Sequence, residues 1–290
     1  MPELVVNEIF HSIQGESSHM GRPCSFIRLT YCNLRCTYCD TAYAFEDGER
    51  MSVDEIIHKV DAFRCGLVEV TGGEPLMQPA VHDLLKGLCD RGYEVLLETG
   101  GSLDISEVDT RVKRIVDFKC PGSGMAKKNL WSNVLHLRKG DEVKFVIRDR
   151  EDFDWSVNHI IGDQISRRCP VLMSVVFGAL EPVELARWVL EAGIDVRFQL
   201  QMHKYVWEPS ARGVLWGVSV LSFLQAGGWI VVLPRRSPGR RTTLPFCTRI
   251  TDSGPSRASL RRSITLPTTS ALNAGLFFHW TIWQESEGRV

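Results

Sequence analysis

Three cysteines on one short segment are the residues of this chain best suited to bind a metal. The segment YCNLRCTYCDT spaces them as Cys32-x3-Cys36-x2-Cys39. Three thiolates on one loop can each bind a different iron of a four-iron cubane cluster. The fourth iron then keeps an open coordination position, which suits a cluster that must bind a ligand rather than only pass electrons. The spacing therefore predicts a 4Fe-4S cluster held by three cysteines.

Zinc is the alternative metal for these cysteines. A structural zinc site normally has four protein ligands, arranged as two separated pairs, so Cys24 or a histidine would have to supply the fourth. Disulfides are disfavoured because the chain has nine cysteines, an odd number, and because residues 1–10 lack the pattern of a secretory leader. The cysteines are therefore expected in the reducing cytoplasm, where clustered thiols bind metals more often than they pair.

The overall composition is that of an ordinary globular protein. The chain has 290 residues, of which 44% are hydrophobic and 24% charged, and its formal net charge is −1. This length permits one large domain or two small ones. The nearly neutral total gives no support for a general role on nucleic acid or on a membrane surface.

The total charge conceals two unlike parts. Residues 1–214 carry 25 Lys and Arg against 32 Asp and Glu, whereas residues 215–290 carry nine Arg, no Lys and three acids. The second part is rich in Ser, Thr, Pro and Arg and shows no sustained helical or strand period, so it lacks the pattern that buries a core. We predict a catalytic domain over residues 1–214 and a largely disordered extension over residues 215–290.

Three interpretations of the extension are open. It is a basic arm, a membrane anchor, or an appended stretch without a selected fold. Residues 215–233 are uncharged and precede arginines, but a Gly-Gly pair, two serines and a glutamine make them a poor membrane span. The absence of lysine beside many arginines favours an appended stretch.

Strand patterns alternate with helical patterns through residues 1–214. The predicted strands cover residues 25–29, 67–71, 94–98, 114–118, 142–147, 171–176 and 196–200. The predicted helices cover residues 52–63, 79–91, 129–137, 151–164 and 182–192, and Ser52 with Glu55 forms a capping box before the first of them. Strands that alternate with helices pair in parallel through right-handed crossovers. The pattern predicts an α/β fold, an open or partial β/α barrel with its site at the carboxyl ends of the strands.

The motifs with chemical potential follow these strands. The cysteine loop follows the first predicted strand, Gly72-Gly73-Glu74-Pro75 follows the second, and Glu98-Thr99-Gly100-Gly101 ends the third. By itself, Gly-Gly reads as a strand-to-helix turn, and Glu98 as a solvated strand end. Their shared position at one edge of the sheet favours a site.

These residues carry a resemblance to a known superfamily. The cysteine spacing, with aromatic Tyr38 before the last cysteine, and the Gly-Gly-Glu-Pro motif resemble the radical S-adenosylmethionine superfamily. Further segments resemble the 7-carboxy-7-deazaguanine synthase family; they are NEIF (7–10), SIQGE (12–16), FIRL (26–29), CDT (39–41), ETGG (98–101), DFKCPGSG (117–124) and QMHK (201–204). The match runs from residue 1 to about residue 214.

The resemblance implies which residues bind the cofactors. Cys32, Cys36 and Cys39 would be the cluster ligands and thus the catalytic centre. S-adenosylmethionine would meet Gly72, Gly73 and Glu74 at its methionine end and Tyr38 near its adenine. Glu98, Asp117 and Lys119 would lie around its ribose and carboxylate, and Ser174 would be a further cofactor-binding residue.

The resemblance also implies the substrate side of the site. The substrate of the family is 6-carboxy-tetrahydropterin, a flat ring with a carboxylate, for which Arg28 offers a planar fork. The remaining substrate contacts would be Ile13, Gln14, Gly15, Glu16, Thr71 and His203. Thr41 would bind Mg²⁺, which prefers oxygen ligands and keeps several waters; Asp40 would orient the loop.

The expected activity is radical-mediated ring contraction of that pterin to 7-carboxy-7-deazaguanine, with loss of ammonia, a lyase step of queuosine and 7-deazapurine synthesis. The resemblance implies a cytoplasmic homodimer and a reductant such as flavodoxin or ferredoxin, without a nucleic-acid or membrane partner. Two alternatives remain: another radical enzyme, such as a glycyl-radical activase, and a zinc-stabilised binding module that is not an enzyme.

Overall fold

The computed structural model of the chain describes residues 2–209 and 211–213. All of them belong to one compact unit, Met1–Val218. The predicted disorder of residues 215–290 lies outside the described residues, and the domain boundary near residue 214 stays a prediction.

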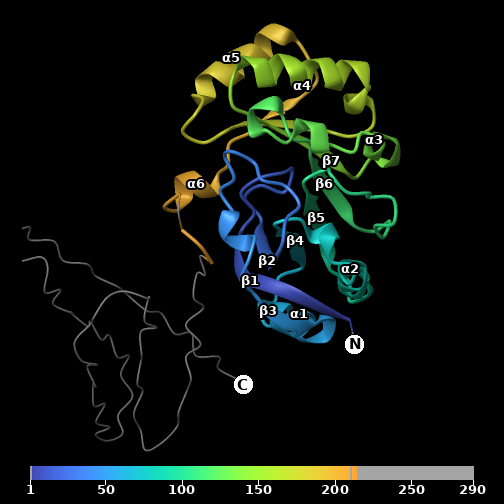
Figure 1. Cartoon of the computed structure of the whole chain (residues 1–290). Coiled ribbons are helices and arrows are strands. Elements are labelled where there is room, and N and C mark those ends of the chain that lie inside the picture. The colour runs from blue at the N-terminus through green and yellow to red at the C-terminus, as the bar shows by residue number, and fades with distance from the viewer. Residues whose placement is uncertain (1, 210, 214–290) are drawn as a thin grey trace, which may run out of the picture. The chain divides into compact units, whose positions relative to one another are not determined.

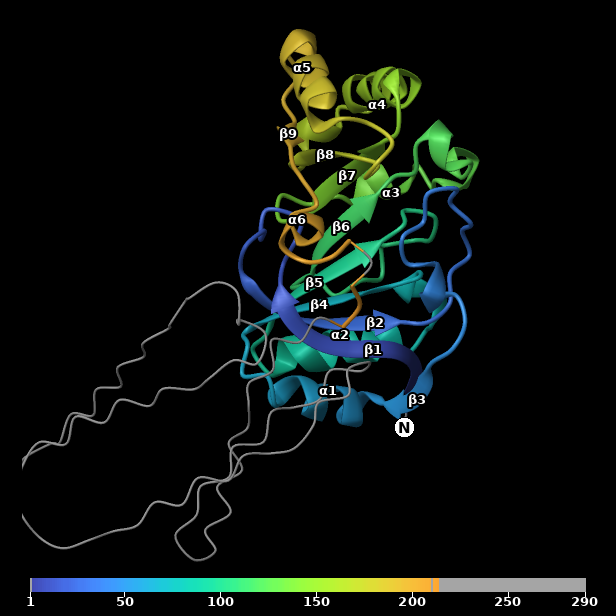
Figure 2. The ribbon, with the colours of Figure 1, turned by 90° about the vertical axis from the view of Figure 1, so that its left-hand side faces the viewer.

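One mixed sheet organises the described residues, with its strands in the order β3-β1-β2-β4-β5-β6-β7-β8-β9. The strands are β1 (Glu3–Ile13), β2 (Pro23–Leu29), β3 (Glu49–Ser52), β4 (Leu67–Gly72), β5 (Glu94–Thr99), β6 (Lys113–Asp117), β7 (Glu142–Ile147), β8 (Val171–Val175) and β9 (Arg197–Phe198). β1 pairs antiparallel with β2 and with β3, whereas all pairs from β2 to β9 are parallel. Figure 2 shows these strands following one another from β1 to β9. The edge strands β3 and β9 do not pair with each other, so the predicted open barrel is confirmed.

Helices follow most of the parallel strands. They are α1 (Val53–Asp61), α2 (Val81–Asp90), α3 (Asn133–His136), α4 (Arg150–Gly162), α5 (Pro182–Ala192) and α6 (His203–Val206), with short 3-10 turns η1 (Ala42–Ala44), η2 (Pro75–Met77), η3 (Pro121–Ser123), η4 (Ala126–Lys128) and η5 (Ile165–Arg167). Figure 1 shows α6 across the sheet from α2 and α3. The predicted capping box is present, because the side chain of Ser52 accepts from Glu55 N while the carboxylate of Glu55 accepts from Ser52 N.

The two faces of the sheet differ in chemistry. Alternate residues of the parallel strands, such as Val68, Val70 and Phe145, lie in the main hydrophobic core beneath the helices. The other face carries a small apolar floor made of Cys24, Phe26, Leu67, Leu96 and Ile115. On the same face, polar and charged residues lie nearer the carboxyl ends of the strands. The alternation therefore points ionisable side chains into the open barrel.

Two sequence predictions differ from the structure. β1 and β3 were not predicted. They form an antiparallel pair at one edge of the sheet, and a pattern of alternating strands and helices gives no sign of such a pair. The predicted helix over residues 129–137 is wrong, because only α3 is helical there. The side chain of Asn129 instead bonds both the N–H and the C=O of Lys119, and the Asn133 amide donates to Leu103 O. These side-chain bonds hold the backbone out of a continuous helix.

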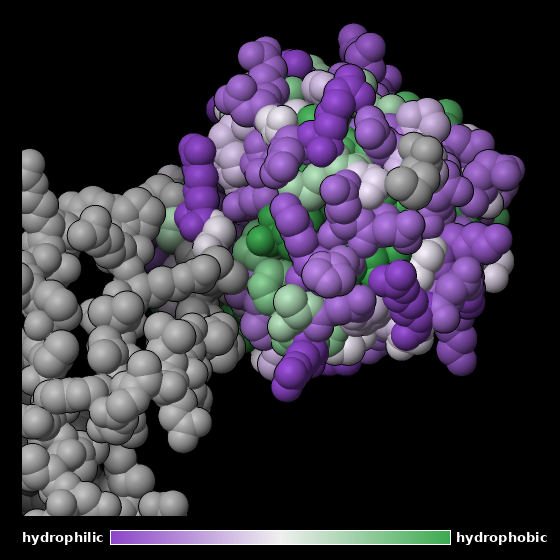
Figure 3. Space-filling view, turned by 90° about the horizontal axis from the view of Figure 1, so that it is seen from below, coloured by the Kyte–Doolittle hydropathy of each residue, from purple (hydrophilic) through white to green (hydrophobic). Residues whose placement is uncertain are grey.

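The surface of the described part is mainly polar. On the side seen in Figure 3, hydrophilic residues dominate and hydrophobic ones show between them. Among the described helices, none has the length and the apolar character needed to cross a membrane.

Candidate active site

The cysteine loop lies at the carboxyl end of β2, where it is tied to distant strands. Thr37 N donates to Ser123 O at 3.0 Å, and its hydroxyl donates to Gly122 O at 2.8 Å. The hydroxyl of Tyr38 donates to Val146 O of β7 at 3.2 Å. These bonds hold the loop against the ends of β6 and β7, which is where parallel α/β sheets bind their ligands.

The three cysteines of the loop fit a cubane cluster better than a single ion. Cys32, Cys36 and Cys39 are free and partly buried. Within residues 2–209 and 211–213, no three His, Cys, Asp or Glu side chains converge on one metal position, as zinc would require. A cubane needs a different arrangement, since each thiolate binds its own iron. Burial raises the pKa of Cys36 to about 11, and the nearby Lys119 ammonium opposes that rise.

The Gly-Gly turn after β4 packs directly against the start of this loop. Gly73 N donates to Leu29 O at 3.1 Å, and Glu74 N donates to Tyr31 O at 2.7 Å. A Cβ on Gly73 would lie 2.1 Å from Tyr31 O, and Gly72 has a φ of +152°. Only glycine permits this approach of two backbones. The turn and the cysteine loop are thus parts of one structure.

The side chain of Glu74 faces the protein rather than the barrel. Its carboxylate is fully buried and accepts from Gly100 N at 2.7 Å, from Leu76 N at 3.1 Å and from the hydroxyl of Thr99 at 2.9 Å. Burial raises the pKa of Glu74. The side chain therefore joins the ends of β4 and β5, and the cofactor contact predicted for Glu74 stays a prediction.

A buried lysine that sequence reasoning missed lies at the centre of the ionisable residues. Nζ of Lys144, on β7, lies 2.9 Å from Oε2 of Glu16 and 3.6 Å from Oδ2 of Asp117, and it also pairs with Glu98. Nζ of Lys119 lies 2.8 Å from the same Asp117 oxygen. Burial alone would lower the pKa of Lys144, but the three carboxylates raise it well above its ordinary value. Lys144 is therefore an ammonium ion at neutral pH.

Eight buried side-chain atoms have no protein partner within the described part of the chain, and two of them belong to predicted cofactor residues. These two are Oδ1 of Asp117 and Oγ of Ser174, and both residues were predicted to contact S-adenosylmethionine. Buried polar groups are almost always satisfied, so an unpaired pair at the strand ends fits a site completed by a ligand. The donor set thus fits the cofactor that the cysteine loop requires.

Arg28, on β2, is oriented by a carboxylate. Its Nε donates to Oε1 of Glu8 at 2.7 Å, and the same oxygen accepts from the hydroxyl of Tyr43 at 2.9 Å. Among the residues that the structure describes, none bonds the terminal nitrogens of the guanidinium. The hydroxyl of Thr71, the register partner of Arg28, donates to Oε2 of Glu98 at 3.4 Å. Arg28 thus keeps its planar edge for an anion.

The remaining predicted substrate residues lie where the segment around His203 contacts the loop that follows β1. Met202 N donates to Gly15 O, two residues after Ile13 ends the strand. A Cβ on Gly15 would lie 2.2 Å from Nδ1 of His203, and Gln201 donates to Oε1 of Glu16 at 2.9 Å. Burial lowers the pKa of His203, so the imidazole is neutral at neutral pH.

Thr41 lies between the cysteine loop and this substrate side. Its hydroxyl donates to Oδ1 of Asp40 at 3.0 Å, and Oδ2 of Asp40 lies 2.5 Å from Nζ of Lys204. Burial would raise the pKa of Asp40, but the ion pair with Lys204 lowers it to about 2. Asp40 therefore links Thr41 to Lys204, and its role in orienting the loop stays a prediction.

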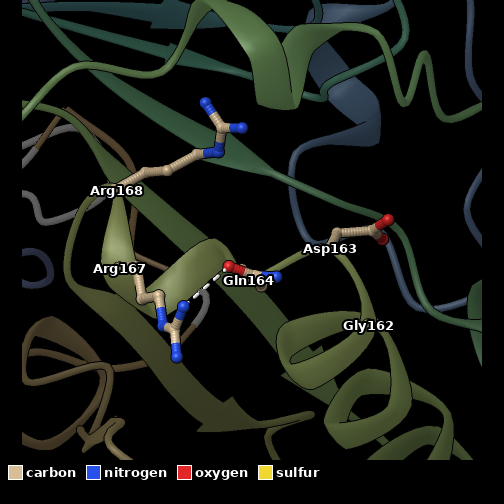
Figure 4. A pocket seen from close by; sticks show the side chains of 5 residues that line it. All are labelled: Gly162, Asp163, Gln164, Arg167 and Arg168. Atoms are coloured by element: carbon tan, nitrogen blue, oxygen red, sulfur yellow. Dashed lines mark hydrogen bonds between the residues drawn. The ribbon is translucent and has the colours of Figure 1, made fainter.

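Two shallow, open depressions of the surface lie apart from these residues. One is a depression of about 290 Å³ at the end of α4, lined by Gly162, Asp163, Gln164, Arg167 and Arg168 (Figure 4). It precedes β8 and so lies at the amino ends of the strands, opposite the cysteine loop. The other lies along β3 and α1, among residues such as Glu49 and His58. Neither contains a residue predicted for the site.

The open barrel, the cysteine loop and the glycine turn define a radical S-adenosylmethionine enzyme. Residues 26–121 match the Radical SAM superfamily. Crystalline QueE from Escherichia coli superimposes with a TM-score of 0.57 at 20% identity, over 69% of this chain and 95% of that chain, which shows the fold. The superfamily binds a 4Fe-4S cluster and S-adenosylmethionine.

Relatives identify the family within this superfamily. The 7-carboxy-7-deazaguanine synthase of Chlorobaculum tepidum is 50% identical over 214 residues, covering 73% of this chain and 97% of the relative. That of Koribacter versatilis is 41% identical, covering 72% of this chain and 99% of the relative. The chain belongs to the 7-carboxy-7-deazaguanine synthase family and is a lyase of 7-deazapurine synthesis. The zinc module and the glycyl-radical activase are thereby set aside.

Proposed function

We propose that this chain contracts the ring of 6-carboxy-5,6,7,8-tetrahydropterin to 7-carboxy-7-deazaguanine and releases ammonia. One observation carries the proposal: the Gln14–Glu16 loop lies against His203, and the next residue, Lys204, pairs with Asp40 beside Cys39. Arg28 lies one residue before the end of β2, which the cysteine loop follows. Family membership supports the reaction, and the arrangement supports the substrate. When bound, the cluster and S-adenosylmethionine supply the radical that abstracts a hydrogen atom from the substrate.

The chain's own residues would bind and orient this substrate. The guanidinium of Arg28, held by Glu8, offers two parallel N–H donors to the substrate carboxylate. Glu16, an ion-pair partner of Lys144, accepts from the amino groups of the ring. His203 is neutral and can accept or donate at Nδ1, which lies against Gly15. The flat ring would thus be held from both of its edges.

We further propose that Mg²⁺ is held at Thr41. The described residues offer no three-ligand site, so the ion would complete its shell with water and substrate oxygens, as Mg²⁺ commonly does. A flavodoxin or ferredoxin as electron donor, a homodimeric state and a cytoplasmic location are parts of the same proposal.

The test is an anaerobic assay after reconstitution with iron and sulfide. Reductant, S-adenosylmethionine, Mg²⁺ and the pterin are added, and mass spectrometry follows 7-carboxy-7-deazaguanine and 5′-deoxyadenosine. We expect the deazaguanine product from the wild type and none from Cys36→Ala. Release of 5′-deoxyadenosine without that product would overturn the proposed substrate.

A further inference from the structure

Glu69 is a buried carboxyl group to which the motifs of the sequence assign no role. It lies on β4, where the register places it between Phe26 of β2 and Leu96 of β5, both part of the apolar floor. Glu69 is only 4% exposed. A polar group at such a position is costly unless it is hydrogen-bonded. Its partner is the side-chain amide of Gln14, whose Nε2 donates to Oε2 of Glu69.

The other end of the Gln14 amide also has a fixed role. Its Oε1 accepts from Glu16 N at 3.2 Å. The backbone of Gln14 is held as well, because its N–H donates to Arg22 O and its C=O accepts from Gly21 N, both at 2.8 Å. The two ends of a glutamine amide have nearly the same shape, so hydrogen bonds alone decide which end is oxygen. The N–H of Glu16 can only donate, so it meets the oxygen end of the amide, and the nitrogen end is then held by Glu69.

The charges around Glu69 leave it without a counter-ion of its own. The groups that face it are Glu16, Glu98, Lys144 and Cys24. Lys144 is already shared by Glu16, Glu98 and Asp117. Burial, and next the charge of Glu98, raise the pKa of Glu69. The carboxyl group is therefore suited to hydrogen bonding rather than to pairing with a cationic ligand.

We propose that Glu69 is a positioning residue that fixes the amide orientation of Gln14, so that Gln14 presents an N–H donor to the substrate ring. One N–H of Nε2 is directed to Glu69, and the second is left for an acceptor atom on the ring edge. A pterin has such acceptors in its ring nitrogen and carbonyl oxygen. The inference rests on the proposed function for the identity of the substrate. It adds Glu69 as a residue that influences substrate specificity through Gln14 without touching the substrate.

The test compares Glu69→Gln with Glu69→Leu. The glutamine variant would still offer an oxygen to the Gln14 amide, whereas the leucine variant would offer none. Kd of 7-carboxy-7-deazaguanine is measured by calorimetry on reconstituted enzyme with S-adenosylmethionine, beside KM and kcat for the pterin. We expect Glu69→Leu to weaken Kd and raise KM by about tenfold, corresponding to about 1.4 kcal/mol. KM for S-adenosylmethionine and iron content should not change, and Glu69→Gln should stay within about twofold of the wild type.

A double-mutant cycle distinguishes loss of the bond between Glu69 and Gln14 from a general loss of folding in Glu69→Leu. Gln14→Leu alone should weaken Kd as much as Glu69→Leu, and the double variant should be no weaker than Gln14→Leu, since the two residues act as one unit. Additive losses would overturn the proposal. So would a collapse of kcat in Glu69→Gln, which would make Glu69 a proton carrier. A wild type that binds neither pterin nor product would instead overturn the proposed function. Normal binding by Glu69→Leu beside weakened binding by Gln14→Leu would overturn only the role of Glu69.

Discussion

Nζ of Lys144 lies 2.9 Å from Oε2 of Glu16, so a strand from the middle of the chain provides the counter-ion for the loop after β1. The same ammonium also meets Glu98 of β5 and Asp117 of β6. The lysine side chain is 5% exposed. Lys144 therefore connects the predicted substrate residue Glu16 with the predicted cofactor residues Glu98 and Asp117 through one buried charge.

Removing that charge should destabilise the protein strongly. Lys144→Met leaves three carboxylates without their shared cation, and breaking a buried ion pair in this way costs about 3–5 kcal/mol. We expect the free energy of unfolding in urea to fall by about 3 kcal/mol. Arg187→Met is the matched control, because it breaks an exposed pair with Glu184 and should cost less than about 1 kcal/mol. Equal losses in the two variants would contradict the central role of Lys144.

Arg28→Lys should weaken binding of the pterin while leaving the cofactor side intact. Lysine keeps the positive charge but loses the planar fork, and also the Nε that Glu8 holds. We expect KM for the pterin to rise by about tenfold, or about 1.4 kcal/mol. KM for S-adenosylmethionine and the iron content serve as internal controls. An unchanged KM for the pterin would show that a point charge is enough.

Gly73→Ala should disturb the cysteine loop. The new Cβ would meet Tyr31 O at 2.1 Å, a backbone atom that cannot move alone. Such overpacking costs about 1–3 kcal/mol, and here the strain falls on the cluster loop. We expect less iron per chain after reconstitution and less 5′-deoxyadenosine. Gly66→Ala is the control, since nothing in the described part of the chain lies within 4 Å of its Cβ; iron loss in that variant as well would refute a specific clash.

Glu94 should make stability depend on pH in the acid range. The hydrogen bond from Arg22, with further bonds from Lys113 and His19, lowers the pKa of Glu94 to about 2. A carboxyl whose pKa is depressed on folding stabilises the protein above its unfolded pKa of about 4.3. That contribution is lost as the pH falls through the folded pKa.

Glu94→Gln removes this contribution. Partial exposure screens the pairs, so we expect the variant to be less stable than the wild type at pH 7 by about 1 kcal/mol. The deficit should shrink between about pH 4.3 and about pH 2 and be absent below that range. Urea unfolding across this range measures it. A deficit that persists unchanged down to about pH 2 would argue that packing, not charge, is lost.

Much of the fold was predictable because its parallel strands are buried on both faces. The runs at Leu67–Gly72 and Glu142–Ile147 are apolar and β-branched, and the strand predicted over residues 142–147 has the observed bounds. β1 was not predicted because apolar and polar residues alternate only weakly along it. Its pairing with β2 depends on tertiary structure. β9 is shorter than the predicted strand over residues 196–200, since it pairs with β8 alone among the described strands.

The parts of the site formed by contiguous motifs could be predicted from the sequence. The parts formed by residues far apart in the sequence could not. The cysteine loop and the Gly-Gly turn are contiguous in sequence. Lys144 and Glu69 are charged residues inside largely apolar strands, and their partners Glu16 and Gln14 lie 128 and 55 residues away. The signal that would have found them is a charged residue in phase with the inward face of a buried strand. The partner of such a charged residue depends on the order of the strands in the sheet, which the sequence pattern does not give.

The ties of the cysteine loop also set an order of events during synthesis on the ribosome. The hydrogen bonds from Thr37 to Ser123 and from Tyr38 to Val146 can form only after Ser123 and Val146 have been synthesised. The loop therefore cannot take its final form earlier. The contact between Gly15 and His203 forms only after almost all of the described residues have been made. The pair between Asp40, next to Cys39, and Lys204 forms at the same late stage, so one side of the cysteine loop stays open until the residues that recognise the pterin have been made.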